Sequence, residues 1–413
     1  MANNNNVMIE SLDNGMTVVG VKMAEVSSAA FTMMMRCGAA YDPAERLGTA
    51  TVLTELAFKG AGEFDNRTLN DRLDGLGLQR QENVGTRHSL FSGAILGDNL
   101  YDVLDLYADV LRRPHLDEAD FQTSRALALQ ELASLEDDPR QKIGLLTHAA
   151  YLPAPWNHPS PGVWDHLQVL TIDDVRKHFQ QFFSPRGVIL AVAGNVNFDR
   201  LRQTVHKAFG DWDGQEAPAL NVETPPAACV HQANQGAQVH IGLMYPSVGY
   251  NDIRFFIALA AEGVLSGGMG SRLFMEVREK RGLCYSVSVG HQVIGSTGAV
   301  QGYVGSSPDK AQEALDVTIG ELHRLADGIT PEELERAKVG LRASLIMQGE
   351  ATTARAGAAA KDYYYLGRVR NLDEYETAIA AVTLDDVIAY ARQFRPEPMT
   401  VATIGPKQLQ KPQ

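Results

Sequence analysis

Arg278 and Tyr285 have side chains of types that can bind a carbonyl group. They lie seven residues apart. An arginine can donate a fixed fork of hydrogen bonds to a carbonyl oxygen. A tyrosine hydroxyl can donate to the oxyanion that forms when water attacks that carbonyl. Taken alone, the pair is better explained as a charge on a surface helix and a strand residue that packs on a sheet.

A second group of candidate residues begins in a helix expected over 47–59. This helix carries Thr51, Thr54 and Glu55, and a later expected helix carries Glu131. Carboxylates are common ligands of divalent metals, so Glu55 and Glu131 could hold a metal ion together. The simpler interpretation of Glu131 is a solvated helix residue, and it is the one favoured by the lack of histidines around it.

The segment 48–60 resembles the zinc-motif region of the M16 (pitrilysin-type, M16B) peptidases. In that family a His-x-x-Glu-His motif lies between Gly-x-Ala and Phe-Lys-Gly, and 48–50 and 58–60 read Gly-Thr-Ala and Phe-Lys-Gly here. Two histidines four residues apart on a helix face the same way and can share one zinc, and the glutamate can activate the metal-bound water. The resemblance covers nearly the whole chain.

The resemblance implies that the zinc motif of this chain is degenerate. Thr51, Thr54 and Glu55 stand where the family has its first histidine, its glutamate and its second histidine, and the third zinc ligand maps to Glu131. Threonine is a poor neutral ligand for zinc, and Thr54 cannot accept a proton near neutral pH. We therefore expect no metal in this chain and no peptide cleavage by the chain alone.

The segment 271–287 retains a second signature of the same family. It contains Arg278 and Tyr285, which in the family act on the substrate from the domain facing the zinc. Because its zinc motif is lost while this pair is intact, the chain resembles the zinc-less subunit of a two-chain M16 peptidase. In such enzymes that subunit closes the peptide chamber. The resemblance implies a heterodimer with a zinc-binding M16 subunit, zinc in that partner, and a periplasmic location. It also implies unfolded peptide substrates, bound by strand addition to a sheet edge.

Two other functions stay open on the sequence alone. A structural or assembly subunit with the M16 fold would take no part in proteolysis, so changes at Arg278 and Tyr285 would leave peptidase activity unchanged. A different enzyme would use Glu55 and Glu131 around another metal. That enzyme would contain stoichiometric metal when the chain is purified.

The elements that would position these residues occur twice along the chain. Residues 170–194 and 382–405 each read as a helix cap, a helix, a turn, an apolar strand and a glycine, with Thr171 and Thr383 as N-caps. The copies lie 212 residues apart, which indicates a duplicated domain. We expect an α+β fold of two tandem homologous domains, each a mainly antiparallel β-sheet with helices packed on one face.

The boundary between the two domains is expected in a segment rich in proline, alanine, asparagine and glycine. The predicted organisation is an N-terminal domain over 1–212, a linker over 213–236 and a C-terminal domain over 237–413. In the first domain we expect strands over 16–21, 29–36 and 89–96 and helices over 47–59, 66–76, 100–112 and 117–136.

Charge and composition exclude several classes of partner. The 413 residues carry a formal net charge of -13, which argues against nucleic acid, because phosphate binding needs clustered Lys and Arg. No apolar run reaches the roughly 18 residues that span a bilayer. Cys37, Cys229 and Cys284 form no CxxC pair and are expected to be buried, inert thiols. The first residues do not read as a signal peptide.

Overall fold

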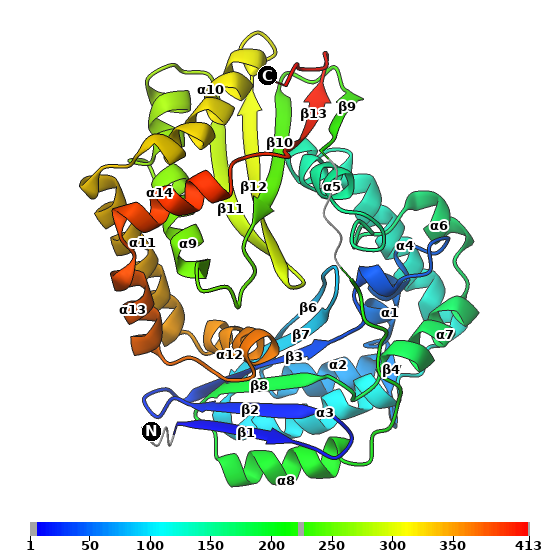
Figure 1. Ribbon diagram of the computed structural model, residues 1–413. Coiled ribbons are helices and arrows are strands. Elements are labelled where there is room, and N and C mark those ends of the chain that lie inside the picture. The colour runs from blue at the N-terminus through cyan, green and yellow to red at the C-terminus, as the bar shows by residue number, and fades with distance from the viewer. Residues whose placement is uncertain (1–5, 222–226, 412–413) are drawn as a thin grey trace. The chain divides into compact units, whose positions relative to one another are not determined.

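The chain folds into two compact units. The computed structural model describes residues 6–221 and 227–411. Within these residues, unit 1 is drawn from Met1–Ala133, His158–Leu220 and Gln348–Arg370, and unit 2 is drawn from Ser134–Asn157, Asn221–Met347 and Asn371–Gln413. Each unit is built on one large sheet with helices packed against it (Figure 1).

The sheet of unit 1 has six strands, in the order β1-β2-β8-β3-β7-β6. All neighbouring strands pair antiparallel except β2 and β8, which are parallel. The strands are β1 (Val7–Ser11), β2 (Thr17–Lys22), β3 (Ser28–Met35), β6 (Gln79–Val84), β7 (Ser89–Leu96) and β8 (Ile189–Gly194). The helices are α1 (Thr49–Leu56), α2 (Asn66–Gly75), α3 (Leu100–Arg112), most of α4 (Glu118–Leu135), α6 (Trp164–Val169), α7 (Ile172–Phe182), α8 (Phe198–Phe209) and α12 (Thr352–Leu366), with short elements η1 (Ala39–Tyr41), η2 (Gly97–Asn99), β4 (Gly60–Ala61) and β5 (Phe64–Asp65).

The sheet of unit 2 has five strands, in the order β11-β12-β10-β13-β9, and only β13 and β9 pair in parallel. The strands are β9 (Cys229–Ala233), β10 (Val239–Ser247), β11 (Ser286–Ile294), β12 (Thr297–Ser306) and β13 (Thr400–Gly405). The helices are α5 (Pro139–Tyr151), α9 (Phe255–Ser266), η3 (Phe274–Glu279), α10 (Ala311–Arg324), η4 (Leu325–Asp327), most of α11 (Pro331–Glu350), α13 (Leu372–Ala381) and α14 (Leu384–Gln393). The predicted α+β class with mainly antiparallel sheets is confirmed.

The two sheets repeat one topology. The order β6-β7-β3-β8-β2 of unit 1 corresponds to β11-β12-β10-β13-β9 of unit 2, and β1 is an addition to unit 1. The predicted N-caps are confirmed as well. The hydroxyls of Thr171 and Thr383 accept from the amides of Asp174 and Asp386, and each forms a capping box at the start of α7 and α14.

The core of unit 1 covers both faces of its sheet. Because successive side chains of a strand point to opposite faces, β3 sends Phe31 and Met33 into the main core with α1 and α3, and sends Ala30 and Met34 the other way. The second face is covered by small side chains of α12, namely Ala356, Ala359 and Ala360. The structure thus adds a helix on the face where none was expected.

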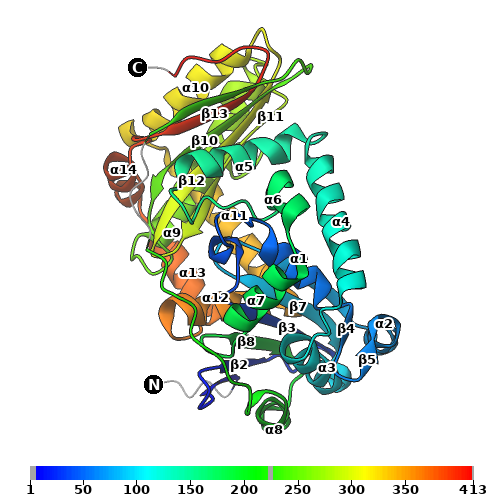
Figure 2. The ribbon, with the colours of Figure 1, turned by 90° about the vertical axis from the view of Figure 1, so that its right-hand side faces the viewer.

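Two helices are exchanged between the sequence repeats. Helix α5 follows the first repeat in sequence but belongs to unit 2, where it packs on β10 and β13. Helix α12 belongs to the second repeat in sequence but lies in unit 1 on β2, β3 and β8. Figure 2 shows α5 lying along the sheet of unit 2, where Ile143 packs with Ala402 and Ile404.

Replacing Gly242 by alanine is expected to destabilise unit 2 by about 1–3 kcal/mol, because it overpacks the contact between β10 and α5. A Cβ at Gly242 would lie 1.8 Å from the buried hydroxyl oxygen of Thr147 on α5. Gly340→Ala is the control, since no atom lies within 4 Å of a Cβ there and Gly340 is in helix α11. Urea unfolding of both variants checks the prediction, and equal stability of the two would contradict it.

The predicted linker and the predicted thiols need two corrections. Residues 222–226 of the linker lie outside the described residues. Cys229–Ala233, however, forms β9, a short strand at the edge of the sheet. Its amino-acid composition does not indicate a strand, so it was assigned to the linker. Cys37 and Cys284 are buried as expected, and burial raises the pKa of the Cys37 thiol to about 12. Cys229 is exposed because it begins this edge strand, so its predicted burial was wrong.

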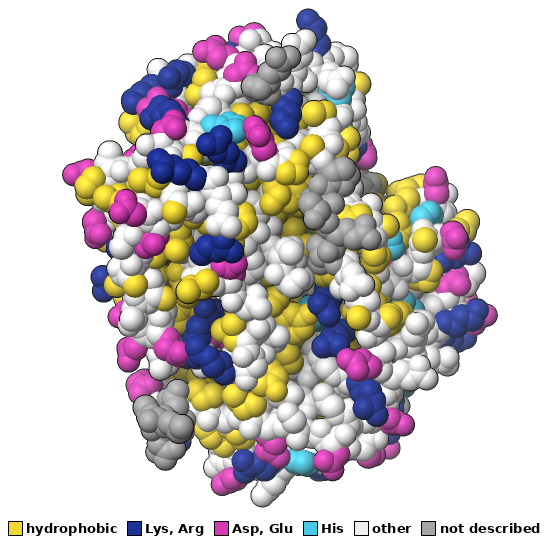
Figure 3. Space-filling view, in the orientation of Figure 1, with side chains coloured by type: hydrophobic (Ala, Val, Ile, Leu, Met, Phe, Trp, Pro, Cys, Tyr) yellow, Lys and Arg dark blue, Asp and Glu magenta, His cyan; other side chains and the backbone are white. Residues whose placement is uncertain are grey.

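Two properties of the described residues concern the expected absence of membrane and nucleic-acid partners: the apolar character of the helices and the distribution of charge on the surface. In the described residues, no helix is both long and apolar enough to cross a membrane. On the face drawn in Figure 3, Lys and Arg side chains lie among Asp and Glu side chains and do not form one continuous basic surface.

Candidate functional site

Helix α1 carries Thr51, Thr54 and Glu55, and a buried aspartate fixes the start of this helix. The Asp42 carboxylate accepts hydrogen bonds from the amide of Gly48 at 2.7 Å and from the amide of Ala50 at 2.8 Å. Amides in the first turn of a helix have no partner within the helix, so a side-chain acceptor there stabilises it. Asp42 therefore sets where the candidate residues of α1 lie.

Burial raises the pKa of Asp42 to about 7, although the amides of α1 oppose the shift. Nε2 of His178 lies 3.7 Å from the carboxylate, but burial lowers the pKa of His178 to about 3. The imidazole is therefore neutral at neutral pH, and the contact is not an ion pair.

The raised pKa of Asp42 predicts a pH-dependent stability. A group whose pKa is higher in the folded state stabilises the fold at low pH, and this contribution is lost as the pH rises through the folded pKa. Between about pH 4 and about pH 7, the free energy of unfolding of the wild type should therefore fall relative to that of Asp42→Asn. Urea unfolding of both proteins across this range checks the sign, and parallel pH profiles would contradict it.

A cavity of about 280 Å³ in unit 1 brings the assigned positions together. Its walls come from α1, α4, β6 and the loop at Ser160 and Pro161. Thr51, Thr54, Glu55 and Glu131 all line it. Residues that the sequence separates by about 80 positions therefore face one space.

The donors around this cavity do not fit a tetrahedral zinc site. The Thr51 hydroxyl donates to the carbonyl of Ser160 at 2.5 Å, and a Glu55 carboxylate oxygen lies 2.6 Å from the Lys59 ammonium. Zinc sites in proteins use histidine, cysteine and carboxylate donors, and neither threonine supplies one. In the part of the chain that the structure describes, no three His, Cys, Asp or Glu side chains form a group that could hold a metal ion.

The sequence analysis missed several polar residues of the cavity, among them Ser124 and Glu82. Ser124 precedes Glu131 by two helical turns on α4, so the helical period could have placed both on one face. Glu82 lies on β6, where its carboxylate accepts from Arg80 at 3.1 Å and burial raises its pKa. Nothing in the local sequence indicates that β6 lies beside α1, because that contact depends on the tertiary fold.

Arg278 and Tyr285 belong to unit 2, and both are accessible. The Arg278 side chain is 46% exposed and its guanidinium lies 4.9 Å from the ring centroid of Phe274 in the π-helical segment η3. The chain then turns at Gly282, whose φ is 60°, a value that favours glycine. Tyr285 is 60% exposed just before β11. Both side chains can therefore reach a molecule outside the chain.

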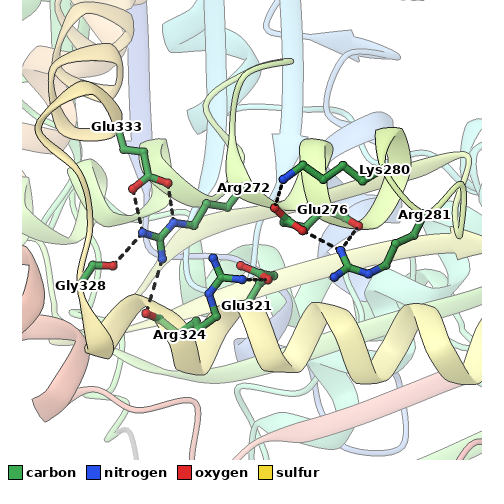
Figure 4. A network of polar contacts seen from close by, with 8 residues as sticks. All are labelled: Arg272, Glu276, Lys280, Arg281, Glu321, Arg324, Gly328 and Glu333. Carbon is green, nitrogen blue, oxygen red and sulfur yellow. Dashed lines mark hydrogen bonds and ion pairs between the residues drawn. The ribbon is translucent and has the colours of Figure 1, made fainter.

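A network of ion pairs fixes the segment that carries Arg278 (Figure 4). The Arg272 guanidinium forms two hydrogen bonds with the Glu333 carboxylate, at 2.6 and 2.7 Å, and links the start of the segment to α11. The Glu276 carboxylate accepts from Lys280 at 2.6 Å and from Arg281 at 2.7 Å. Arg272 is almost fully buried, so its paired geometry restrains the backbone. The residues alone had indicated only a charge on a surface helix at Arg278.

Comparisons with known proteins agree with this architecture. Residues 17–156 match the family model "Insulinase (Peptidase family M16)", and residues 170–341 match "Peptidase M16 inactive domain". An uncharacterized zinc protease of Streptomyces coelicolor is 28% identical over 407 residues, which cover 96% of this chain and 89% of that protein. An uncharacterized zinc protease of Bacillus subtilis is 27% identical over 403 residues, with 95% and 97% covered.

Solved structures share the whole fold. A crystal structure described as a peptidase M16 inactive domain from Pseudomonas fluorescens superposes with a TM-score of 0.88 at 21% identity, covering 98% of this chain and 99% of that one. A protease from Helicobacter pylori gives a TM-score of 0.87 at 20% identity, covering 96% and 99%. Matches to both M16 family models and a shared architecture over nearly all residues lead to one conclusion: the chain belongs to peptidase family M16.

Proposed function

We propose that this chain is the zinc-less subunit of a heterodimeric M16 peptidase whose other subunit holds the zinc. The observation that carries the proposal is the donor set of the cavity in unit 1. One threonine hydroxyl there is bonded to the Ser160 carbonyl, and Glu55 is paired with Lys59. A chain with this donor set needs a partner for metal-dependent hydrolysis.

The contribution of this chain to catalysis would come from unit 2. Arg278 and Tyr285 are exposed on a segment that Arg272 and Glu333 hold in place. In the heterodimer, Arg278 would hold the substrate carbonyl with its fork of donors. The Tyr285 hydroxyl would donate to the oxyanion that forms on that carbonyl. Zinc in the partner would supply the activated water.

The rest of the chain would close the peptide chamber of the heterodimer. We expect the substrate to be an unfolded peptide that pairs with a sheet edge, because main-chain hydrogen bonds bind extended peptides of many sequences. The expected compartment is the periplasm. These expectations follow from the family resemblance, and each requires its own measurement.

Three samples test the proposal: this chain alone, a candidate zinc-binding M16 subunit alone, and the mixture of the two. We expect peptide cleavage by the mixture only, with zinc bound at one equivalent per heterodimer. Strong cleavage by this chain alone, abolished by a chelator, would refute the proposal. Stoichiometric metal in this chain alone would instead favour an enzyme that uses Glu55 and Glu131. Binding of the two chains without cleavage would favour a structural role.

A further inference from the structure

Two arginines, two tyrosines and a histidine gather at one end of the sheet of unit 1 and form what we call the arginine cluster. Its members are Arg36, Tyr41, Arg87, His88 and Tyr364. Arg36 follows β3, Arg87 and His88 lie in the turn between β6 and β7, and Tyr364 lies on α12. Because Met35 of β3 pairs with Ser89 of β7, Arg36 and His88 lie at the same end of these two strands.

Backbone and ring contacts hold the arginine cluster together. The amide of Gly38 donates to the carbonyl of Arg87 at 3.2 Å, which bonds the segment that leads to Tyr41 to the turn between β6 and β7. The ring centroids of His88 and Tyr364 lie 4.6 Å apart, and the Arg87 guanidinium lies 5.5 Å from the centroid of the Tyr364 ring. Segments that are far apart in the sequence therefore meet at the cluster.

The positive charge of the arginine cluster exceeds the negative charge paired with it. Arg36 forms an ion pair with Glu216 at 2.9 Å, but the Glu216 side chain is 66% exposed, and water and salt weaken such a pair. Arg87 forms no ion pair with any described residue. Burial, together with the charges of Arg87 and Arg36, lowers the pKa of His88 to about 3, so its imidazole is neutral at neutral pH. The cluster therefore lacks negative charge.

Four buried polar atoms of the arginine cluster make no hydrogen bond within the described part of the chain. They are Nε of Arg36, Nε of Arg87, the hydroxyl oxygen of Tyr41 and Nε2 of His88. Tyr41 is 6% exposed, and burial raises the pKa of its hydroxyl although the charges of Arg87 and Arg36 oppose the shift. The hydroxyl therefore keeps its proton and can donate. A buried donor without an acceptor is unfavourable, and a charged one more so.

A bound oxyanion would satisfy both the charge and the donors of the arginine cluster. Guanidinium groups form short, charge-assisted hydrogen bonds with the oxygens of phosphate and carboxylate. A phosphate group carries close to two negative charges at neutral pH and offers several acceptor oxygens, so it matches two guanidinium groups and a tyrosine hydroxyl. A water molecule could bond to the same donors but would leave the charge of Arg87 without a counterion.

We propose that the arginine cluster binds a phosphate group, which accepts hydrogen bonds from Arg87 and Tyr41 and is neutralised by Arg87 and Arg36. The ligand is inorganic phosphate or a small phosphate monoester, which share this chemistry. The site binds the anion and performs no reaction. Because Tyr364 joins α12 to the cluster, the bound phosphate also strengthens the attachment of α12 to the sheet. The inference is independent of the proposed function, since neither a partner subunit nor a peptide enters the site.

Isothermal titration calorimetry of the full chain tests the inference, with inorganic phosphate and glycerol 3-phosphate as probes in a chloride buffer of constant ionic strength. We expect saturable binding of one equivalent with a Kd of about 1 mM or below, and Arg87→Gln should weaken it tenfold or more. Arg200→Gln is the matched control, because the Arg200 guanidinium also lies over a tyrosine ring, 3.9 Å from the centroid of Tyr101, and none of its nitrogens is buried without a partner. Tighter binding of glycerol 3-phosphate would identify a monoester as the ligand, and tighter binding of inorganic phosphate would identify the free ion. No saturable binding of either probe, or equal binding by Arg87→Gln, would overturn the inference.

Thermal unfolding of Tyr41→Phe gives a second test, which also serves if Arg87→Gln does not fold. Without phosphate, loss of a buried hydroxyl that has no partner should leave the Tm unchanged or raise it. With saturating phosphate, the Tm of Tyr41→Phe should rise less than that of the wild type, because one donor to the ligand is missing. Arg200→Gln should respond like the wild type, which accounts for the general effect of phosphate on protein stability. An equal rise in Tyr41→Phe and the wild type would refute the site.

Discussion

Replacing Asp362 by alanine is expected to destabilise the fold by about 3–5 kcal/mol, because it leaves a buried guanidinium without its charge partner. Asp362 is 1% exposed and Arg370 is 8% exposed at their side chains. The Arg370 guanidinium donates twice to one carboxylate oxygen, at 2.9 and 2.6 Å, and the Arg370 amide donates to the other at 2.8 Å. The change removes all three bonds at the end of α12.

Urea unfolding of Asp362→Ala measures this loss. Asp71→Ala is the control, because Asp71 and Arg67 form a surface pair at 3.7 Å with side chains 73% and 91% exposed. Such a pair contributes about 0–1 kcal/mol. Similar unfolding midpoints for the two variants would show that the buried pair does not stabilise unit 1.

The second large effect concerns turnover of the reconstituted heterodimer. Tyr285→Phe and Arg278→Ala should each lower kcat by about 100-fold, by analogy with the loss of a single oxyanion donor. Zinc bound to the heterodimer should stay unchanged, because neither residue is a zinc ligand in the proposal. Both side chains are largely exposed, so their loss should cost little stability.

Steady-state kinetics with matched variants checks the two roles. Arg278→Lys keeps the charge but loses the fork of donors, so its kcat should lie nearer to that of the alanine variant than to the wild type. Arg342→Ala, a change at an exposed position of α11, should leave kcat unaltered. Unchanged turnover in both Arg278→Ala and Tyr285→Phe would refute the proposed catalytic role of these residues. It would not bear on the proposal that the chain closes the peptide chamber.

Local sequence signals predicted much of the fold. The helices expected over 66–76 and 100–112 are α2 and α3, and the strand expected over 89–96 is β7. Thr171 and Thr383 were recognised as caps because a threonine followed by acidic residues satisfies the first amides of a helix. These features depend on neighbours within one or two turns.

Contacts between distant segments could not be predicted in the same way. The period of α5 indicates an apolar face, but nothing in it tells which sheet that face covers, and α5 packs in unit 2. The sequence identified Thr51, Thr54, Glu55 and Glu131 as candidate residues of this cavity, whereas Glu82 joins it only through the tertiary fold. Cys229 is exposed because a parallel edge strand formed where the composition indicated a linker.

The exchange of α5 and α12 makes each half of the gene product incomplete by itself. A fragment that ends at the junction of the repeats would lack α12, and Ala30, Ala191 and Ala193 on its sheet would meet water. The complementary fragment would lack α5 over Ala402 and Ile404. Fusion of a homodimer whose two copies exchange a helix would leave such an arrangement in one polypeptide. The two fragments should therefore fold together when they are co-expressed and aggregate when each is expressed alone.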